Sequence, residues 1–138
     1  MKIHDIMHKD CCYIEADESL QLAATKMQRE DVGALPVARN DKLVGMITDR
    51  DIVVRGVAVN KDVRRTRVSE LMSSGVLYCF DDDDIEKVAE NMAQQKVRRL
   101  PVVDREKKLL GMVSLGDIAW RASGNAAGEA LSEISGAA

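Results

Sequence analysis

A short pattern that occurs twice constrains this chain more than any other feature of its sequence. The stretch Gly45-Met46-Ile47-Thr48-Asp49-Arg50-Asp51-Ile52 returns as Gly111-Met112-Val113-Ser114-Leu115-Gly116-Asp117-Ile118. In each copy an apolar run ends at a hydroxyl residue and a carboxylate follows three positions later, which predicts a strand, a tight turn and the start of a helix. The same pattern is that of a helix N-cap, which needs no ligand. Its recurrence indicates an internal duplication.

The duplication extends well beyond this turn. In both halves a short helical turn, a β-prone run, an amphipathic helix and a second apolar run come first, at an offset of 65 or 66 positions. The sequence therefore predicts an α/β fold of two β-α-β-β-α repeats with pseudo-two-fold symmetry. A repeat of about 50 residues is too small to bury both faces of its sheet, so we expect the two sheets to pack together.

The expected elements can be placed by residue. Helical turns are expected at residues 4–7 and 68–72, and first strands at residues 12–14 and 77–80. Asp17 and Asp82 are predicted to cap the helices that follow. The second strands contain proline, which predicts an edge or entry position. The apolar stripe of the long helix is expected to consist of Leu20, Ala23, Ala24 and Met27 in the first repeat, and of Ile85, Val88, Ala89 and Met92 in the second. The second strands are Leu35-Pro36-Val37 and Leu100-Pro101-Val102.

We expect three segments. Residues 1–66 are predicted to form the first repeat with a helical lead-in and linker, residues 67–122 the second repeat, and residues 123–138 a tail rich in Ala, Gly and Ser. The basic residues of the join at 57–67 are interpreted as a solvated linker, because no aromatic residues interleave with them. Residues 126–134 of the tail are compatible with a helix or with disorder.

Composition excludes several classes of function. Of 138 residues 46% are hydrophobic, as in ordinary globular proteins, and the net charge of −3 argues against binding nucleic acid or an anionic membrane. No apolar run approaches the roughly 20 residues that span a bilayer, and the first residues lack the apolar core of a signal peptide. The cysteines Cys11, Cys12 and Cys79 have no framework spacing, which favours a reducing compartment, and we expect a cytoplasmic protein.

Doubled and in order, these motifs resemble the tandem cystathionine-β-synthase (CBS) domain pair, also called a Bateman module. The resemblance covers nearly all of residues 1–122 and rests on the Leu-Pro-Val strands, the Gly-apolar-apolar-Thr/Ser-x-x-Asp turns and the helical lead-ins. The chain looks like a stand-alone pair, similar in layout to small bacterial stress or hypoxic-response proteins. This implies a non-catalytic regulatory module that senses an adenosine-containing ligand (AMP, ADP, ATP, NAD(H) or S-adenosylmethionine) in the cleft between the repeats.

Two turns carry the candidate ligand-binding residues. A carboxylate can accept hydrogen bonds from both hydroxyls of a ribose, so we expect this role for Asp51 and Asp117. Thr48 and Ser114 can cap the helix and still bond a sugar or phosphate oxygen. Arg50 is expected to contact phosphate in the first copy.

The second copy differs in its basic residues. It has Gly116 where the first has Arg50, which puts phosphate binding at that turn in doubt. Arg98 and Arg99 match positions where similar proteins place basic phosphate contacts, and their first-copy counterparts are Gly33 and Ala34. The two sites are therefore not equivalent. The resemblance implies that strand entries hold the adenine, although each of these residues also suits an ordinary core: Tyr13, Leu35, Tyr78 and Leu100.

A metal- or redox-responsive CBS pair with an empty nucleotide cleft is the alternative function. His4, His8, Cys11 and Cys12 place two imidazoles and two thiols close together in the sequence. The spacing lacks a C-x₂-C pattern, so we predict no metal site. The run Asp81-Asp82-Asp83-Asp84 is interpreted as a helix cap, since the ligand pattern of a calcium loop is absent.

The sequence gives no support to an enzyme. It has no Ser-His-Asp or Cys-His arrangement and no Walker A or Rossmann glycine pattern. We therefore expect no required cofactor, an adenosine-type small molecule as ligand, and an unidentified regulated protein as partner. Apolar residues on the last helix of each repeat have no obvious cover in this chain, and the resemblance implies a flat, two-fold homodimer joined there: Val53, Val54, Ala119 and Trp120.

Overall fold

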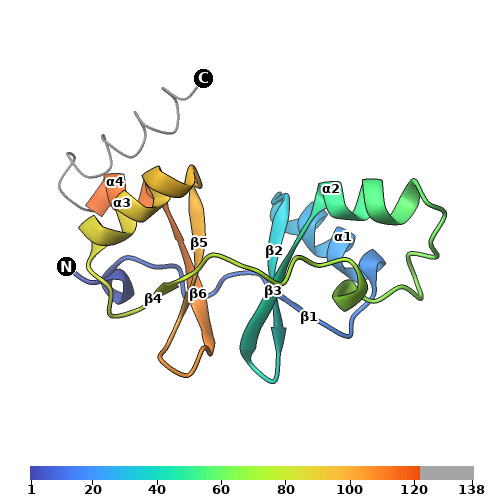
Figure 1. Cartoon of the computed structure of the whole chain (residues 1–138), viewed down its shortest axis with the longest axis horizontal. Helices are drawn as coiled ribbons and strands as arrows, with labels where there is room; N and C mark the ends of the chain where they lie inside the picture. Colours follow the sequence, from blue (N-terminus) through green and yellow to red (C-terminus); the bar gives the residue numbers. More distant parts are fainter. Residues whose placement is uncertain (122–138) are drawn as a thin grey trace. The chain divides into compact units, whose positions relative to one another are not determined.

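The computed structural model describes residues 1–121, so the expected tail lies outside the described residues. The chain forms two compact units (Figure 1). We call Cys12–Val76 the repeat-1 unit, and Met1–Cys11 together with the residues from Leu77 onward the repeat-2 unit. Each holds a three-stranded sheet with one parallel and one antiparallel pairing, in the orders β1-β2-β3 and β4-β5-β6. The predicted α/β class and the two β-α-β-β-α repeats are confirmed.

The strands and α-helices follow the same order in both units, whereas the 3-10 helix comes last in the repeat-1 unit and first in the repeat-2 unit. The repeat-1 unit contains β1 (Ile14–Glu15), α1 (Leu20–Glu30), β2 (Ala34–Arg39), β3 (Lys42–Thr48), α2 (Asp49–Ile52), the π-helical turn η2 (Val53–Val57) and the 3-10 helix η3 (Val68–Glu70). The repeat-2 unit contains the 3-10 helix η1 (Ile3–Asp5), β4 (Cys79–Phe80), α3 (Ile85–Gln95), β5 (Arg99–Val103), β6 (Leu109–Ser114) and α4 (Leu115–Arg121). No helix among them is long and apolar enough to span a bilayer.

The long helices bury the predicted stripes against their own sheets. Helix α3 buries all four expected residues, and α1 buries three of four, because Ala24 is exposed. Both helices end at a residue in the left-handed region, Asp31 (φ 53°) and Lys96 (φ 56°), which stops the helix just before the central strand.

The proline strands are central in their sheets, so of the two positions that the sequence left open, edge and entry, the edge position is wrong. Strand β2 lies between β1 and β3, and β5 lies between β4 and β6. Proline is tolerated there because the first strand of each unit has only two residues. Pairing with it begins at Val37 and Val102, one residue after each proline, and the prolines therefore lie just before the start of the parallel pairing.

The predicted caps Asp17 and Asp82 were also misplaced by two residues. Ser19 is the N-cap of α1 and its Oγ accepts a hydrogen bond from the Leu22 N–H at 3.1 Å. Asp84 holds the N-cap position of α3, but its carboxylate makes no cap bond. Asp17 instead lies within 4 Å of two arginine side chains, and Asp82 binds Arg105. Acidic and hydroxyl residues both suit a cap, so the pattern alone could not choose between neighbours.

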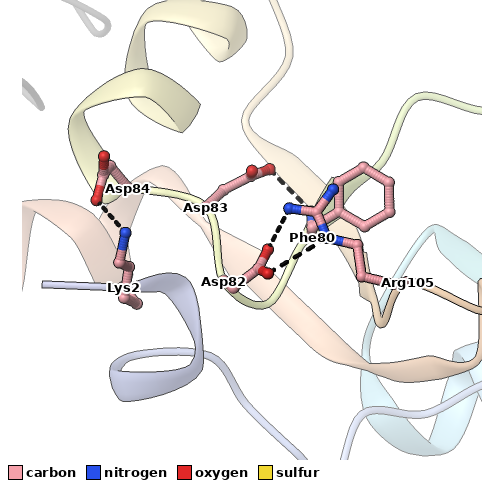
Figure 2. A network of polar contacts seen from close by, with 6 residues as sticks. All are labelled: Lys2, Phe80, Asp82, Asp83, Asp84 and Arg105. Carbon is pink, nitrogen blue, oxygen red and sulfur yellow. Dashed lines mark hydrogen bonds and ion pairs between the residues drawn. The ribbon is translucent and has the colours of Figure 1, made fainter.

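The acidic run at residues 81–84, between β4 and α3, forms ion pairs with the N-terminal lead-in and with the β5–β6 turn (Figure 2). Lys2 Nζ lies 2.8 Å from Asp84 Oδ1, and this hydrogen bond lowers the pKa of Asp84. The Arg105 guanidinium donates to both oxygens of Asp82, which lowers the pKa of that carboxyl, and lies 4.0 Å from the centroid of the Phe80 ring. Each exposed pair contributes little, but together they join the lead-in and the β5–β6 turn to β4.

Each unit combines a repeat with the lead-in of the other repeat. Ile3 and Ile6 belong to the core of the repeat-2 unit, whereas Val68 and Leu71 belong to the core of the repeat-1 unit. After each lead-in the chain pairs with the free edge of a third strand, at His8↔Met112 and at Ser73↔Met46. The compact units therefore divide the chain at different places from the sequence repeats.

Close backbone approach at Gly111 makes this exchange possible. A Cβ at Gly111 would collide with the carbonyl oxygen of His8, whereas a Cβ at Gly75 would meet nothing within 4 Å. We predict that Gly111→Ala lowers the free energy of unfolding by about 1–3 kcal/mol, as overpacking does, and that Gly75→Ala leaves it nearly unchanged. Urea unfolding of both variants measures the difference. Equal stability of the two would contradict the exchanged packing.

Candidate functional site

The two turns singled out by the sequence have the same backbone hydrogen bonds. In the first turn (residues 48–51) Thr48 Oγ1 accepts from the Asp51 N–H at 3.0 Å, and Asp51 Oδ2 accepts from the Thr48 N–H at 2.9 Å. In the second turn (residues 114–117) the corresponding distances are 3.1 Å and 2.8 Å. Each turn is thus a reciprocal capping box, which fixes the carboxylate with one oxygen and leaves the other oxygen for a different partner.

The remaining carboxylate oxygen differs between the turns. Asp117 Oδ1 lies 2.7 Å from Nε2 of His8. Asp51 Oδ1 has its nearest cation, Arg55 Nη1, at 3.8 Å, which is an ion pair but not a hydrogen bond. Arg55 itself donates to the Leu71 carbonyl oxygen at 2.8 Å. Both carboxylates are partly accessible, with 18% and 17% of their side-chain surface exposed.

The basic residues lie at different places in the two units. Arg50 lies in α2 next to Asp51 and is exposed. Arg99 lies in β5 directly opposite Ser114, and the Arg98 carbonyl oxygen accepts from the Leu115 N–H at 2.8 Å. In the repeat-1 unit the residue opposite Thr48 is Ala34, which has no charge. Within the described part of the chain no ion pair engages Arg50, Arg98 or Arg99, so all three cations remain available to an anion.

The residues expected to hold adenine fall into two groups. Leu35 and Leu100 are 0% and 5% exposed and belong to the two cores. Tyr13 and Tyr78 are 40% and 38% exposed, and each has a lysine ammonium over its ring, Lys26 at 5.6 Å and Lys107 at 5.3 Å from the centroid. The tyrosines therefore present aromatic faces, whereas the leucines support the strands.

The candidate metal residues do not converge. Within residues 1–121 no group of three or more His, Cys, Asp or Glu side chains is arranged to hold a metal ion. His4 Nδ1 lies 3.1 Å from Asp5 Oδ1, and His8 Nε2 lies 2.7 Å from Asp117 Oδ1. Burial raises the pKa of the Cys12 thiol, and burial raises that of Cys79 to about 12. Both therefore favour the thiol over the metal-binding thiolate.

The sequence analysis missed one partner of each turn carboxylate, Asp51 and Asp117. His8 was considered only as a metal ligand, although it contacts Asp117, 109 positions away. Arg55, one helical turn after Asp51, was not considered at all. The spacing i, i+4 was a readable signal for Arg55. For His8 no local signal exists, since its placement depends on the exchange of lead-ins.

Comparison with known proteins identifies the family. The model of the CBS domain matches the chain twice, over residues 3–57 and 68–124. The chain belongs to the CBS domain family. CBS domain-containing protein YhcV of Bacillus subtilis is 39% identical over 134 residues, which cover 96% of this chain and 94% of that protein.

Three solved CBS structures are also similar to this chain. Hypoxic Response Protein I with two coordinated zinc ions has a TM-score of 0.78 and 34% identity, covering 89% of this chain and 100% of that one. CBSX2 in complex with AMP has a TM-score of 0.72 and 25% identity, covering 86% and 93%. The CBS pair of MJ0100 with 5-methylthioadenosine and S-adenosyl-L-methionine has a TM-score of 0.70 and 27% identity, covering 87% and 94%.

Hypoxic Response Protein I holds two zinc ions, but the described residues of this chain contain no group of three or more His, Cys, Asp or Glu side chains that could hold one. We predict that zinc chloride leaves the melting temperature of this protein unchanged, because a metal bound by the native state alone would raise it. A thermal-shift assay with and without chelator measures the effect. A rise that the double variant Cys11→Ser/Cys12→Ser abolishes would contradict the prediction and restore the metal alternative.

Proposed function

We propose that this CBS pair is a non-catalytic regulatory module that binds an adenosine-type ligand at its two turns. The observation that carries the proposal is that the two oxygens of each turn carboxylate, Asp51 and Asp117, have different partners. In both turns the capping box holds one carboxylate oxygen, and in the second turn the other oxygen of Asp117 already contacts His8. In the first turn the other oxygen of Asp51 stands at a fixed angle beside Thr48, with Arg55 at 3.8 Å. Such a group suits a ribose, whose two neighbouring hydroxyls need an acceptor.

Other residues of each unit suit the other parts of a nucleotide. An exposed tyrosine, Tyr13 or Tyr78, offers a ring face on which a base can stack. Arginines that make no ion pair within residues 1–121 can donate charge-assisted hydrogen bonds to phosphate: Arg50 in one unit, and Arg98 and Arg99 in the other. The similar CBS structures with AMP and with S-adenosyl-L-methionine share adenosine as the common chemistry of their ligands. The protein that reads the signal is a separate partner.

The first turn is expected to depend on its carboxylate more than the second. Asp51 Oδ1 accepts no hydrogen bond from residues 1–121, while Asp117 Oδ1 is already bonded to His8. We predict that Asp51→Ala weakens AMP binding about tenfold or more, and that Asp117→Ala weakens it less. The cap that either change removes contributes about 1 kcal/mol, so folding should persist. Calorimetric titration of AMP and ATP into wild type and both variants measures the affinities.

Two results of that titration would count against these statements. Absence of binding by wild type at millimolar AMP and ATP would refute adenosine sensing for these ligands. A greater loss of affinity in Asp117→Ala than in Asp51→Ala would refute the assignment of the stronger carboxylate. Circular dichroism of each variant separates a lost contact from a lost fold.

We also propose that the protein is a homodimer joined through the last helices of its units. Val53, Val54 and Val57 are 57%, 45% and 58% exposed, and Trp120 is 86% exposed. Large apolar side chains exposed on the surface of a unit are typical of an interface between protein chains. They lie on the helical segment after the first turn and on α4 after the second, so dimerisation would hold both turns in place.

Sedimentation at micromolar concentration should give about twice the chain mass of 15.2 kDa. Changing Val54 to glutamate should shift the protein to the monomer, because a charge would be buried at the interface without a partner. Glu86→Gln on α3 serves as a surface control and should leave the dimer intact. A wild-type protein that sediments as a clean monomer would contradict the proposal.

A further inference from the structure

His8 is held beside the second turn by its own backbone. Its N–H donates to the Met112 carbonyl oxygen at 2.8 Å, and its carbonyl oxygen accepts from the Met112 N–H at 3.0 Å. The missing side chain at Gly111 lets the His8 backbone approach this closely. The imidazole therefore stands at the free edge of β6, although His8 lies in the segment that precedes the first repeat.

The imidazole completes the hydrogen bonding of Asp117. Nε2 of His8 lies 2.7 Å from Oδ1, and Oδ2 already accepts from the Ser114 N–H at 2.8 Å. A carboxylate only accepts, so the His8 nitrogen supplies the proton. The His8 side chain is 70% exposed and the Asp117 side chain 17% exposed, so the imidazole covers the carboxylate from the solvent side.

The first turn has no such cover. Ser73 holds the position of His8 in the repeat-1 unit, with matching backbone bonds to Met46 at 2.9 Å and 3.0 Å. No hydrogen bond joins the Ser73 side chain to Asp51 within residues 1–121. Arg55 approaches Asp51 Oδ1 only to 3.8 Å. The two units thus share a backbone arrangement and differ in whether the carboxylate is occupied.

Basic residues, by contrast, lie close to the second turn and not at the corresponding positions of the first turn. Arg99 stands directly across the strand pair from Ser114, a separation of about 5 Å between Cβ atoms, whereas Ala34 stands across from Thr48. The first turn also carries Asp49, whose Oδ2 would lie 3.0 Å from a Cβ at Gly33, the counterpart of Arg98. An acid thus lies in the repeat-1 unit where the repeat-2 unit has a basic residue.

We propose that His8 sets the ligand class of the second turn. By occupying Asp117 it withholds the acceptor that a ribose would use, so this turn selects adenosine ligands by their phosphates through Arg98 and Arg99. The first turn, with an open Asp51, selects by the ribose and so binds adenosine itself, while Arg50 adds a contact for those ligands that also carry phosphate. This inference rests on the proposed adenosine binding and assigns a different ligand class to each turn.

The test uses adenosine, which has no phosphate, and ATP in calorimetric titrations of the full chain. An Asp51→Asn background weakens the first turn, so that the second turn is observed. In that background His8→Ala should raise adenosine affinity about tenfold, the worth of one hydrogen bond to a charged group, and change ATP affinity much less. The matched control Ser73→Ala should change neither. Arg99→Ala should lower ATP affinity about tenfold and leave adenosine affinity unchanged.

Each outcome bears on one of the two claims. Unchanged or weaker adenosine binding by His8→Ala, while ATP still binds, would overturn the role of His8 and leave adenosine sensing standing. Failure of wild type to bind adenosine, AMP and ATP at millimolar concentration would refute adenosine sensing, and the role of His8 with it. A separate proton NMR measurement checks the contact without ligand, since Asp117→Asn should shift the imidazole resonances of His8. A spectrum without that shift would also overturn the role of His8.

Discussion

The reciprocal capping box is the interaction on which the rest of this structure depends. A hydroxyl and a carboxylate three residues apart each satisfy the other's backbone N–H, in both repeats and at nearly equal distances. The bonds let a strand turn directly into a helix without leaving buried donors unpaired. They also fix the carboxylate, so a residue needed for folding is presented in a constant orientation. Structural and ligand-binding roles are therefore compatible in one side chain, and the capping pattern alone does not distinguish them.

The exchange of lead-in segments gives the two similar turns different side-chain neighbours. Each third strand has its free edge covered by a residue from the other repeat, His8 in one unit and Ser73 in the other. The backbone contacts match, but the side chains bring an imidazole to one carboxylate and nothing to the other. A single substitution at an edge position can thus change the chemistry of a distant turn while the fold is preserved.

The sequence predicted the parts of the fold that repeat locally. The 65-residue offset, the helix stripes and the two turns define the strand and helix order, because these features depend on spacing within one repeat. Predictions failed where a residue's role depends on neighbours outside its own element. For Pro36 an edge and an entry position were both left open, because the two-residue length of β1 could not be read from the pattern. Asp17 was taken as a cap because Ser19, two positions on, satisfies the same preference.

The residues of the candidate site were likewise predictable from the sequence only where they belong to the repeated motif. Thr48, Asp51, Ser114 and Asp117 follow from the repeated motif, whereas the contact of His8 with Asp117 joins residues too far apart in the chain for any pattern to link them.

The most direct test of the account is an NMR titration of the amide N–H groups with adenosine. We predict that the Thr48 and Asp51 amides shift at lower adenosine concentration than those of Ser114 and Asp117. Parallel shifts at both turns, or shifts confined to other parts of the chain, would contradict the account.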